Sequence, residues 1–167
     1  MVAIVVLALI LGLNSPKSRA AGTNINSSAT SSVAWDDIIG WLDFYSTGIV
    51  QVKGTRLEGY ASSSVGDISL DCATTRSGNI CGSSNYGVCN GPGPKDPTNL
   101  DGTCDAGDAS GELTGYAWND TTGWISFNCD QSSHSGSNDC AISYYNVLII
   151  QNTGDFSGYA WNDTNGW

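Results

Sequence analysis

An acidic stretch in the middle of the chain holds the side chains best suited to chemistry. Residues 96–112 read DPTNLDGTCDAGDASGE and bring carboxylate and amide oxygens close together in the sequence. Calcium is a hard cation that binds several oxygen ligands at once. We therefore expect a calcium site whose ligands are Asn99, Asp101, Asp105 and Asp108. The alternative is a solvated acidic loop without a bound ion.

Other combinations of reactive residues are weak. The only histidine, His134, lies in a serine-rich loop, and the adjacent Asp36 and Asp37 lack an evident apolar pocket that would separate their pKa values. No glycine-rich phosphate loop occurs. The cysteines lack the short chelating spacings of a zinc site. We therefore expect no catalytic residues, and no cofactor unless the acidic stretch binds calcium.

The composition favours strands and an acidic surface. The 167 residues include 6 Lys and Arg against 16 Asp and Glu, which gives a net charge of −10. Such a surface repels nucleic acid, because phosphate binding needs clustered basic side chains. Helix formers are scarce, while 6 Trp and 7 Tyr are many for this length. We therefore expect an all-β protein with no nucleic-acid partner.

The N-terminus carries an apolar run, MVAIVVLALILGL, over residues 1–13. This run is too short to span a bilayer comfortably and has the length of a signal-peptide core. The small residues Ser18 and Ala20 predict cleavage after Ala20, although no basic segment precedes the run. The alternative is a retained anchor or a pilin-like helix, in which case residues 1–13 alone contact a membrane. Residues 21–33 then form a flexible linker.

Internal repeats decide the expected fold. Residues 57–61, 113–117 and 156–160 share a Gly-Tyr-Ala motif, and Ala34 begins a related half-copy. In the two later copies the alanine is followed by Trp-Asn-Asp-Thr-x-Gly-Trp. Aromatic residues at one point of a repeat are typical core residues, and glycan binding by exposed Trp pairs is the alternative. The expected core positions are Trp35, Trp41, Tyr60, Tyr116, Trp118, Trp124, Phe127, Tyr159 and Trp161.

The side chains alternate with a period of two, which predicts strands. Residues 124–129 and 145–150 alternate in this way, and residues 119–123 have the composition of a turn. We expect an all-β fold of antiparallel meander repeats, about three strands per unit. The plain unit has a repeat length of 43 residues, the distance from Ala117 to Ala160. The expected units are 34–61, 62–117 with an acidic insertion at 89–112, 118–160, and the start of a truncated fourth repeat at 161–167.

The 6 cysteines of a chain with an export signal predict a disulfide framework in an oxidising compartment. Two of them occupy the same positions in the second repeat as two others in the third, so each repeat is expected to pair its own. The remaining two close the acidic insertion. The expected disulfides are Cys72–Cys81, Cys89–Cys104 and Cys129–Cys140.

These motifs carry two resemblances. The pattern Gly-Tyr-Ala-Trp-x4-Gly-Trp-Ile-x-Phe, followed by Cys and a Cys-x4-Tyr-x-Val strand, resembles tandem Trp/Gly repeats in secreted or cell-surface proteins of environmental bacteria, notably the candidate phyla. It covers residues 34–167 and implies a surface location, although Ser62 replaces a Trp and the first unit lacks Cys. Residues 99–108 resemble the calcium loops of thrombospondin type 3 repeats, with Pro97 in place of a first acidic ligand.

We therefore expect a secreted or cell-surface structural or adhesive protein without catalytic activity, whose repeats contact each other or neighbouring subunits. The first alternative is a calcium- or glycan-binding surface module with cell-surface glycans as partners. The second alternative is the subunit of an extracellular filament, anchored by residues 1–13.

Overall fold

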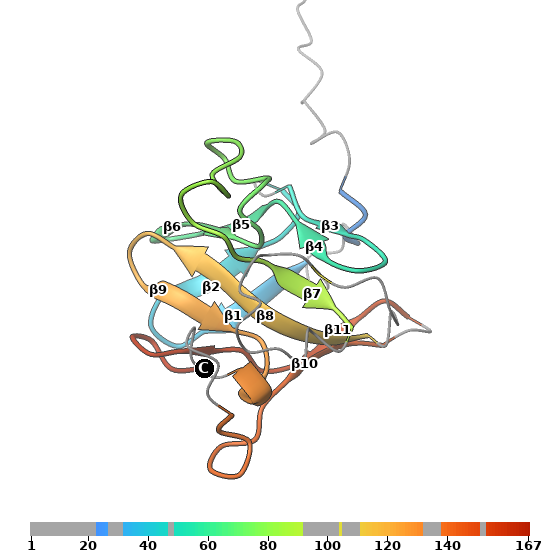
Figure 1. Ribbon diagram of the computed structural model, residues 1–167, viewed down its shortest axis with the longest axis vertical. Helices are drawn as coiled ribbons and strands as arrows, with labels where there is room; N and C mark the ends of the chain where they lie inside the picture. The colour runs from blue at the N-terminus through green and yellow to red at the C-terminus, as the bar shows by residue number, and fades with distance from the viewer. Residues whose placement is uncertain are drawn as a thin grey trace, which may run out of the picture.

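The protein is all-β, and its strands form a curled antiparallel sheet, a half-barrel with three disulfides (Figure 1). The expected signal peptide or anchor at 1–20 and the expected calcium ligands lie outside the residues that the structure describes. The computed structural model describes residues 23–26, 32–46, 49–91, 104, 111–131, 138–150 and 153–167.

Short strands make up nearly all the regular structure in the described part of the chain. One 3-10 turn, η1, covers Cys129–Gln131. The strands are β1 (Val33–Asp36), β2 (Gly40–Asp43), β3 (Gln51–Val52), β4 (Leu57–Glu58), β5 (Tyr60–Ser63), β6 (Gly66–Ser69), β7 (Val88–Asn90), β8 (Glu112–Asn119), β9 (Gly123–Ser126), β10 (Val147–Ile149), β11 (Phe156–Gly158) and β12 (Trp161–Asn162).

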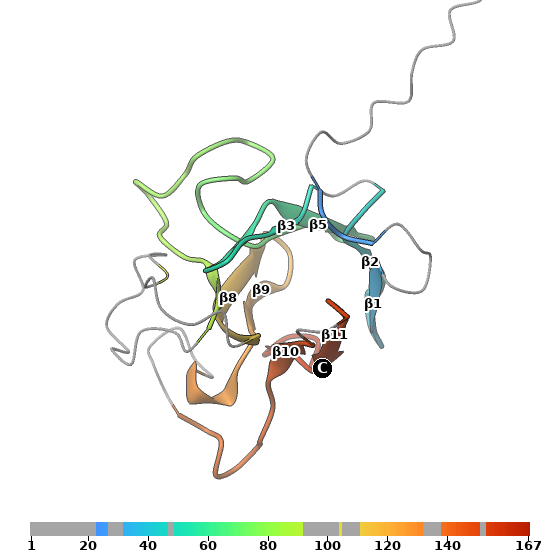
Figure 2. The same ribbon diagram turned by 90° about the vertical axis from the view of Figure 1, so that its right-hand side faces the viewer.

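Three hairpins and a further strand build the wall of the half-barrel. The pairs β1–β2, β5–β6 and β8–β9 are antiparallel hairpins, and β12 pairs with β9. Because β2 also pairs with β5 and β6 with β8, the wall runs β1-β2-β5-β6-β8-β9-β12. Figure 2 shows the sheet curling along an arc, from β1 and β2 past β5 to β8 and β9.

A second group of strands extends the sheet from the long strand β8. This strand also pairs with β7 and with β10, and β10 pairs with β11, while β3 and β4 form a separate two-stranded sheet. Each of β7 and β10 begins at a valine two residues after a buried tyrosine, Tyr86 or Tyr145. The Cys-x4-Tyr-x-Val motif therefore leads a strand back to β8.

Successive side chains of each strand point to opposite faces of the sheet, which separates an apolar inner face from an aromatic outer face. On the inner face the first strand of a hairpin presents alanine, and the second strand presents larger apolar residues. Burial of these side chains contributes about 25 cal/mol per Å² to stability. The inner face comprises Ala61, Ile68, Leu70, Ala117, Ile125 and Phe127 at its centre, with Leu42, Phe44 and Ala160 packed at its ends.

Nine aromatic residues are expected in the core from the sequence, and the structure divides them into three groups. The side chains of the inner face alternate with those of the outer face, so the tryptophans that neighbour the inner alanines point outward and are not core residues. Those that are buried are Tyr60, Tyr116 and Phe127, those that are half-buried are Trp118, Trp124 and Trp161, and those more than half exposed are Trp35, Trp41 and Tyr159.

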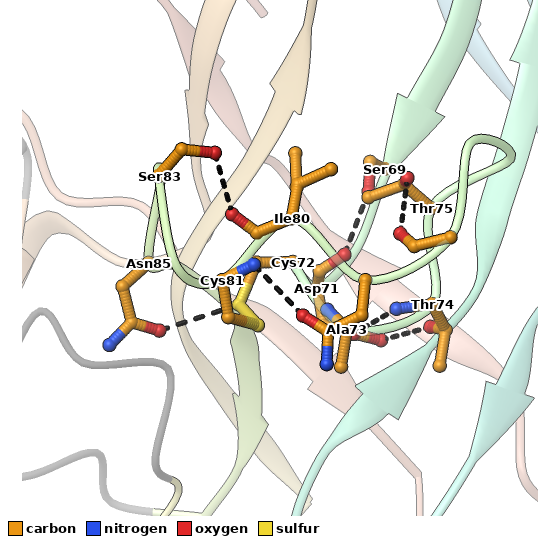
Figure 3. Close-up of a disulfide and its surroundings, with 12 residues drawn as sticks. Ser69, Asp71, Cys72, Ala73, Thr74, Thr75, Ile80, Cys81, Ser83 and Asn85 are labelled. Carbon is orange, nitrogen blue, oxygen red and sulfur yellow. Dashed lines mark hydrogen bonds between the residues drawn. A yellow bond between two sulfur atoms is a disulfide. The ribbon is translucent and has the colours of Figure 1, made fainter.

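Each disulfide closes a loop beside the sheet, and the three are the pairs that the repeat spacing predicts, namely Cys72–Cys81, Cys89–Cys104 and Cys129–Cys140. Figure 3 shows the first of them. The Asp71 carboxylate accepts the backbone N–H groups of Ala73 at 2.6 Å and Thr74 at 2.8 Å. The carbonyl of Cys72 accepts the N–H of Ile80 at 2.8 Å, so hydrogen bonds and the disulfide hold the same loop.

Gly115 marks a point where two strands lie too close for a side chain. Its φ is +81°, and a Cβ there would overlap the carbonyl oxygen of Gly87. The next residue, Tyr116, donates its N–H to the same oxygen at 3.0 Å, which holds the two backbones together. Gly59 and Gly158 make the same close approach to a backbone carbonyl.

We expect Gly115→Ala to destabilise the fold by about 3 kcal/mol or more, because the overlap adds to the cost of a left-handed backbone. Gly154→Ala is the matched control, since its φ is +76° and nothing lies within 4 Å of an added Cβ. The control should lose only about 1–2 kcal/mol. Urea unfolding followed by tryptophan fluorescence measures both, and equal losses would contradict the close approach.

Candidate functional site

Pairs of tryptophans across the hairpins are the most prominent feature of the outer face. The rings are edge-on to each other, with centroids 4.6–4.9 Å apart and planes inclined by 61–68°. Edge-to-face packing of this kind is the favoured geometry of aromatic pairs. The pairs are Trp35 with Trp41, Trp118 with Trp124, and Trp161 with Trp167.

The turn that joins the two strands holds the first ring of each pair in place. The indole Nε1–H of Trp118 donates to Asp120 at 2.7 Å, and Trp35 and Trp161 make the equivalent bond at 2.9 and 2.8 Å. The turn itself is closed by Asn119, whose Oδ1 accepts two backbone N–H groups. Asn and Asp favour this turn because their side chains bond the backbone two or three residues ahead.

Tyrosines cover the second ring in two of the three pairs. Trp124 packs against Tyr86, with centroids 5.4 Å apart, and against Tyr116 at 6.2 Å. Trp167 contacts two tyrosines at the same distances. Within the described residues, Trp41 makes a ring contact only with Trp35, and these two side chains are 61% and 55% exposed. The first hairpin therefore presents an uncovered aromatic pair to solvent.

In the second hairpin an ion pair replaces the tryptophans. Ser62 and Asp67 stand opposite each other, as Trp118 and Trp124 do in the third hairpin. Arg76 pairs with the Asp67 carboxylate and lies over the Tyr60 ring, 4.5 Å from its centroid. An arginine thus occupies the space over this tyrosine that an indole would otherwise fill.

Sequence reasoning missed this exchange, although the signal was present. Ser62 stands where the later repeats have a Trp, but the turn between Ser62 and Asp67 is one residue shorter than that between Trp118 and Trp124. The shorter turn hides the equivalence of Asp67 with Trp124. Arg76 lies in the following loop, where no motif marks it.

The charge pair shifts the ionisation of Asp67. Hydrogen bonds from Arg76 hold the pKa of this carboxyl below its usual range, partial burial opposes the shift, and the positive charge of Arg76 adds to it. The carboxyl therefore ionises more readily in the folded chain than in the unfolded chain. The resulting stabilisation is present above the unfolded pKa of about 3.9 and is lost as the pH falls through the folded value.

We expect Asp67→Asn to lower the free energy of unfolding by less than about 1 kcal/mol at neutral pH, because the pair is partly exposed to solvent. The difference from the unaltered protein should shrink as the pH falls below about 3.9. Urea unfolding of both proteins across this range measures the difference. A difference that does not change with pH would show that the carboxylate charge plays no part.

Side chains that could act in catalysis do not converge in the described part of the chain. The carboxylates of Asp36 and Asp37 serve different purposes, since Asp36 closes the first turn and Asp37 accepts the Trp35 Nε1–H. His134 lies outside the described residues. Burial raises the phenol pKa of three outer-face tyrosines, namely Tyr86, Tyr116 and Tyr145.

One group of metal-ligand atoms occurs among the described residues, and its chemistry does not suit a metal. Cys129, Asp130 and Cys140 bring their ligand atoms within 4.8 Å of one another. Both sulfurs are joined in a disulfide, so neither is available as the thiolate that binds a metal. The group is therefore part of the loop closure.

The expected calcium site remains a prediction, since its four ligands lie outside the described residues. The flanking Cys104 is described, and its disulfide with Cys89 ties the acidic insertion to β7. The predicted ligands are Asn99, Asp101, Asp105 and Asp108.

If the insertion binds calcium, a chelator should lower the thermal midpoint, because calcium at 100 times its Kd stabilises the folded state by about 2.7 kcal/mol. Asp101→Asn combined with Asp105→Asn should remove this calcium dependence. Asp155→Asn, which changes an exposed carboxylate outside the insertion, should leave it intact. Calorimetry with and without calcium decides the matter, and identical midpoints in the unaltered protein would contradict a calcium site.

A cavity of about 370 Å³ lies at the open side of the half-barrel. Figure 2 shows β1 and β11 at this side, across from the arc of β5, β8 and β9. Its lining is mainly apolar, and it also includes polar side chains such as Asp36 and Asn162. The inner face of the sheet is therefore accessible through this cavity.

Comparisons with known proteins give no relative from which a function could be transferred. No protein-family model, curated protein or solved structure matches the chain. Among the described residues, no helix has the length and apolar character needed to cross a membrane. Function is therefore inferred from the geometry of the chain itself.

Proposed function

We propose that the chain is a secreted or cell-surface structural and adhesive protein, built from repeated hairpin units and without catalytic activity. The observation that carries this proposal is the recurrence of one small set of contacts at successive hairpins. In each hairpin the polar side chains form hydrogen bonds that hold the turn and the aromatic rings. In none of these described hairpins do reactive side chains gather around a common point, as an enzyme would require.

The backbone hydrogen bonds support a repeated unit. The carbonyl of the close-approach glycine accepts from the residue two positions before the first cysteine of the loop. Two further bonds join this segment to the segment that returns after the loop. The matched pairs of bonds are Leu70 to Gly59 (2.9 Å) and Phe127 to Gly115 (3.1 Å), Cys72 to Tyr86 (3.1 Å) and Cys129 to Tyr145 (3.0 Å), and Val88 to Leu70 (2.9 Å) and Val147 to Phe127 (3.0 Å).

Side chains in the turns connect each hairpin to the one before it. The Asn119 amide donates to the carbonyl of Asp67 at 2.9 Å. The Asn162 amide donates to the carbonyls of Thr122 at 3.1 Å and Trp124 at 2.7 Å. Units joined through nearest neighbours in this way form extended, stable arrays, which suits a structural role.

The cysteines support an extracellular setting. All six cysteines are paired in disulfides. Such pairing indicates an oxidising compartment, and most oxidising compartments are extracellular. Short hairpins bury little apolar area each, so covalent closure of the loops offsets a small core. Export itself rests on the signal peptide expected at residues 1–20, which lie outside the described residues.

Glycan binding is the second candidate function, and the exposed pair in the first hairpin favours it. Trp35 and Trp41 offer indole surface without tyrosine cover, and the carboxylate of Asp37 lies beside them as a hydrogen-bond acceptor. Flat aromatic surface next to a polar group suits the apolar face and hydroxyls of a sugar ring. The calcium alternative depends on four predicted ligands and the filament alternative on residues 1–13, all of which lie outside the described residues.

Adhesion should depend on this uncovered pair. Beads coated with the Trp35→Ala, Trp41→Ala double variant should be retained on polysaccharide surfaces under flow at least about tenfold less than beads with the unaltered chain, since aromatic anchors contribute more than about 1 kcal/mol each. Tyr144→Ala is the matched control, because Tyr144 is 75% exposed and lies outside the pair.

The outcomes separate the two candidate functions. Retention on several chemically different surfaces, without competition by soluble oligosaccharide, supports general adhesion. Retention that one soluble oligosaccharide abolishes supports glycan binding. Equal retention of the double variant and the unaltered chain would contradict both.

A further inference from the structure

Three apolar side chains are exposed together on the first hairpin. Trp35, Ile38 and Trp41 are each more than half exposed, and we call them the turn cluster. Asp36 closes this turn by accepting the N–H of Ile38 at 2.8 Å, and Thr121 has the same place in the third hairpin. There the Thr121 hydroxyl donates to a carbonyl of the hairpin before it. The first turn therefore keeps the same backbone frame but exposes apolar surface where the later turn is polar.

A second apolar cluster lies on the loop that the Cys129–Cys140 disulfide anchors. Ile142 and Tyr144 are 86% and 75% exposed, and we call them the loop cluster. The backbone carbonyl of Asp139 accepts the N–H groups of Ile142 and Ser143, both at 2.8 Å. The disulfide and these two bonds therefore present the loop cluster on a fixed backbone.

The corresponding loop of the second repeat has the same frame without the apolar side chains. The carbonyl of Ile80 accepts the N–H groups of Ser83 at 2.9 Å and Ser84 at 3.0 Å, as the carbonyl of Asp139 does in the third repeat. Ser83 and Asn85 stand at the positions of the loop cluster and are exposed. The frame folds with polar residues there, so the loop cluster is not needed to hold the loop.

Tyrosines beside the disulfide loops cover tryptophan pairs within the chain. The rings are edge-on with centroids 5.4 Å apart, and each contact joins one repeat to the next. Trp41 has no such tyrosine among the described residues, and Tyr144, which adjoins Tyr145, has no ring contact there. Each of these two exposed rings therefore lacks the kind of neighbour that the other supplies. The contacts within the chain are Tyr86 on Trp124 and Tyr145 on Trp167.

The two clusters lie in different parts of the molecule. Figures 1 and 2 show the orange loop before β10 projecting from the foot of the molecule, away from β1 and β2. Both clusters are exposed, so they do not cover each other within one chain. A contact between them therefore requires two molecules.

We propose that the loop cluster of one copy packs against the turn cluster of a second copy, so that copies join head to tail. The tyrosine-on-tryptophan contact that joins neighbouring repeats is then made between molecules. Because the two clusters are different surfaces, each copy binds one neighbour at each of them, which produces an open series or a ring. The inference rests on the structural role proposed above and names its partner, a second copy of this chain.

The contact is small and its surroundings are acidic. Two clusters of five side chains in total should bury less than the about 1,200 Å² of a stable complex, so the association is weak in dilute solution. It becomes effective where many copies are held close together at a surface. Asp37 and Asp139 adjoin the two clusters, and the chain carries a net charge of −10. Salt screens this repulsion and should strengthen the contact.

The test uses two variants of the full chain, each altered in one cluster. The loop variant, Ile142→Ser with Tyr144→Asn, has in its third loop the residue types of the second loop. The turn variant is Ile38→Thr with Trp41→Ala. Sedimentation at about 0.1–1 mM should show association of the unaltered chain, and each variant should weaken it at least about tenfold. Ile150→Ser is the matched control, since it removes an exposed apolar side chain outside both clusters and should associate normally.

A mixture of the two variants tests whether the two clusters meet each other. Each variant keeps the cluster that the other lacks, so an equimolar mixture should form one-to-one pairs and nothing larger. Raising sodium chloride from about 0.05 to 0.5 M should tighten the association of the unaltered chain. Circular dichroism checks that both variants are folded.

Four results would overturn the proposal. They are an unaltered chain that stays monomeric at about 1 mM in high salt, a loop variant that associates like the unaltered chain, a mixture that stays monomeric, and an association that salt weakens. Bead retention separates this proposal from adhesion, because the loop variant keeps Trp35 and Trp41. Beads coated with it should still be retained on polysaccharide surfaces, although the variant no longer self-associates.

Discussion

Alternation of side chains across each hairpin is the constraint on which the other features depend. Because successive residues point to opposite faces, a shift of one residue would carry the tryptophans inside and the alanines out. On the inner face an alanine packs beside larger apolar residues, as Ala61 and Ala117 do. The same alternation leaves the outer face to the indoles, where the turn aspartates hold them and the tyrosines cover two of the three pairs. The glycines with positive φ then let neighbouring backbones meet without a side chain between them.

The ion pair that replaces the tryptophans in the second hairpin indicates which of the two faces can vary. Asp67 and Arg76 stand where an indole stands elsewhere, yet Ala61 and Ile68 pack inside as their counterparts do. A charged pair is tolerated because this position is partly exposed to water, so neither group loses its hydration fully. On the inner face the same exchange would bury unpaired charge at a cost of several kcal/mol. The outer face is therefore where units can differ in chemistry while the wall stays the same.

Much of the fold follows from the sequence, and the rest depends on tertiary geometry. Period-two patterning and turn residues predict the antiparallel hairpins around Trp118–Trp124, and motif spacing predicts the three cysteine pairs. Patterning does not reveal which face of a hairpin turns inward, since both carry apolar side chains, and for that reason Trp35 and Trp41 were expected in the core. The sequence pattern does not predict the cavity either, because residues of β1 and of the last strands line it together although they are far apart in the sequence. The acidic residues 99–108 remain the part of the candidate site that sequence alone describes.

The first turn differs from the later ones in a single chemical group. Asn119 and Asn162 each accept hydrogen bonds within their own turn and donate the amide N–H to the preceding hairpin. Asp36 accepts in the same way, but a carboxylate has no N–H to give. The carbonyl of Ile39 in this turn still accepts a bond from Ser64 in the next hairpin. The series therefore has a polarity among the described hairpins: each later turn donates to the hairpin before it, and the Asp36 carboxylate has no N–H with which to do so.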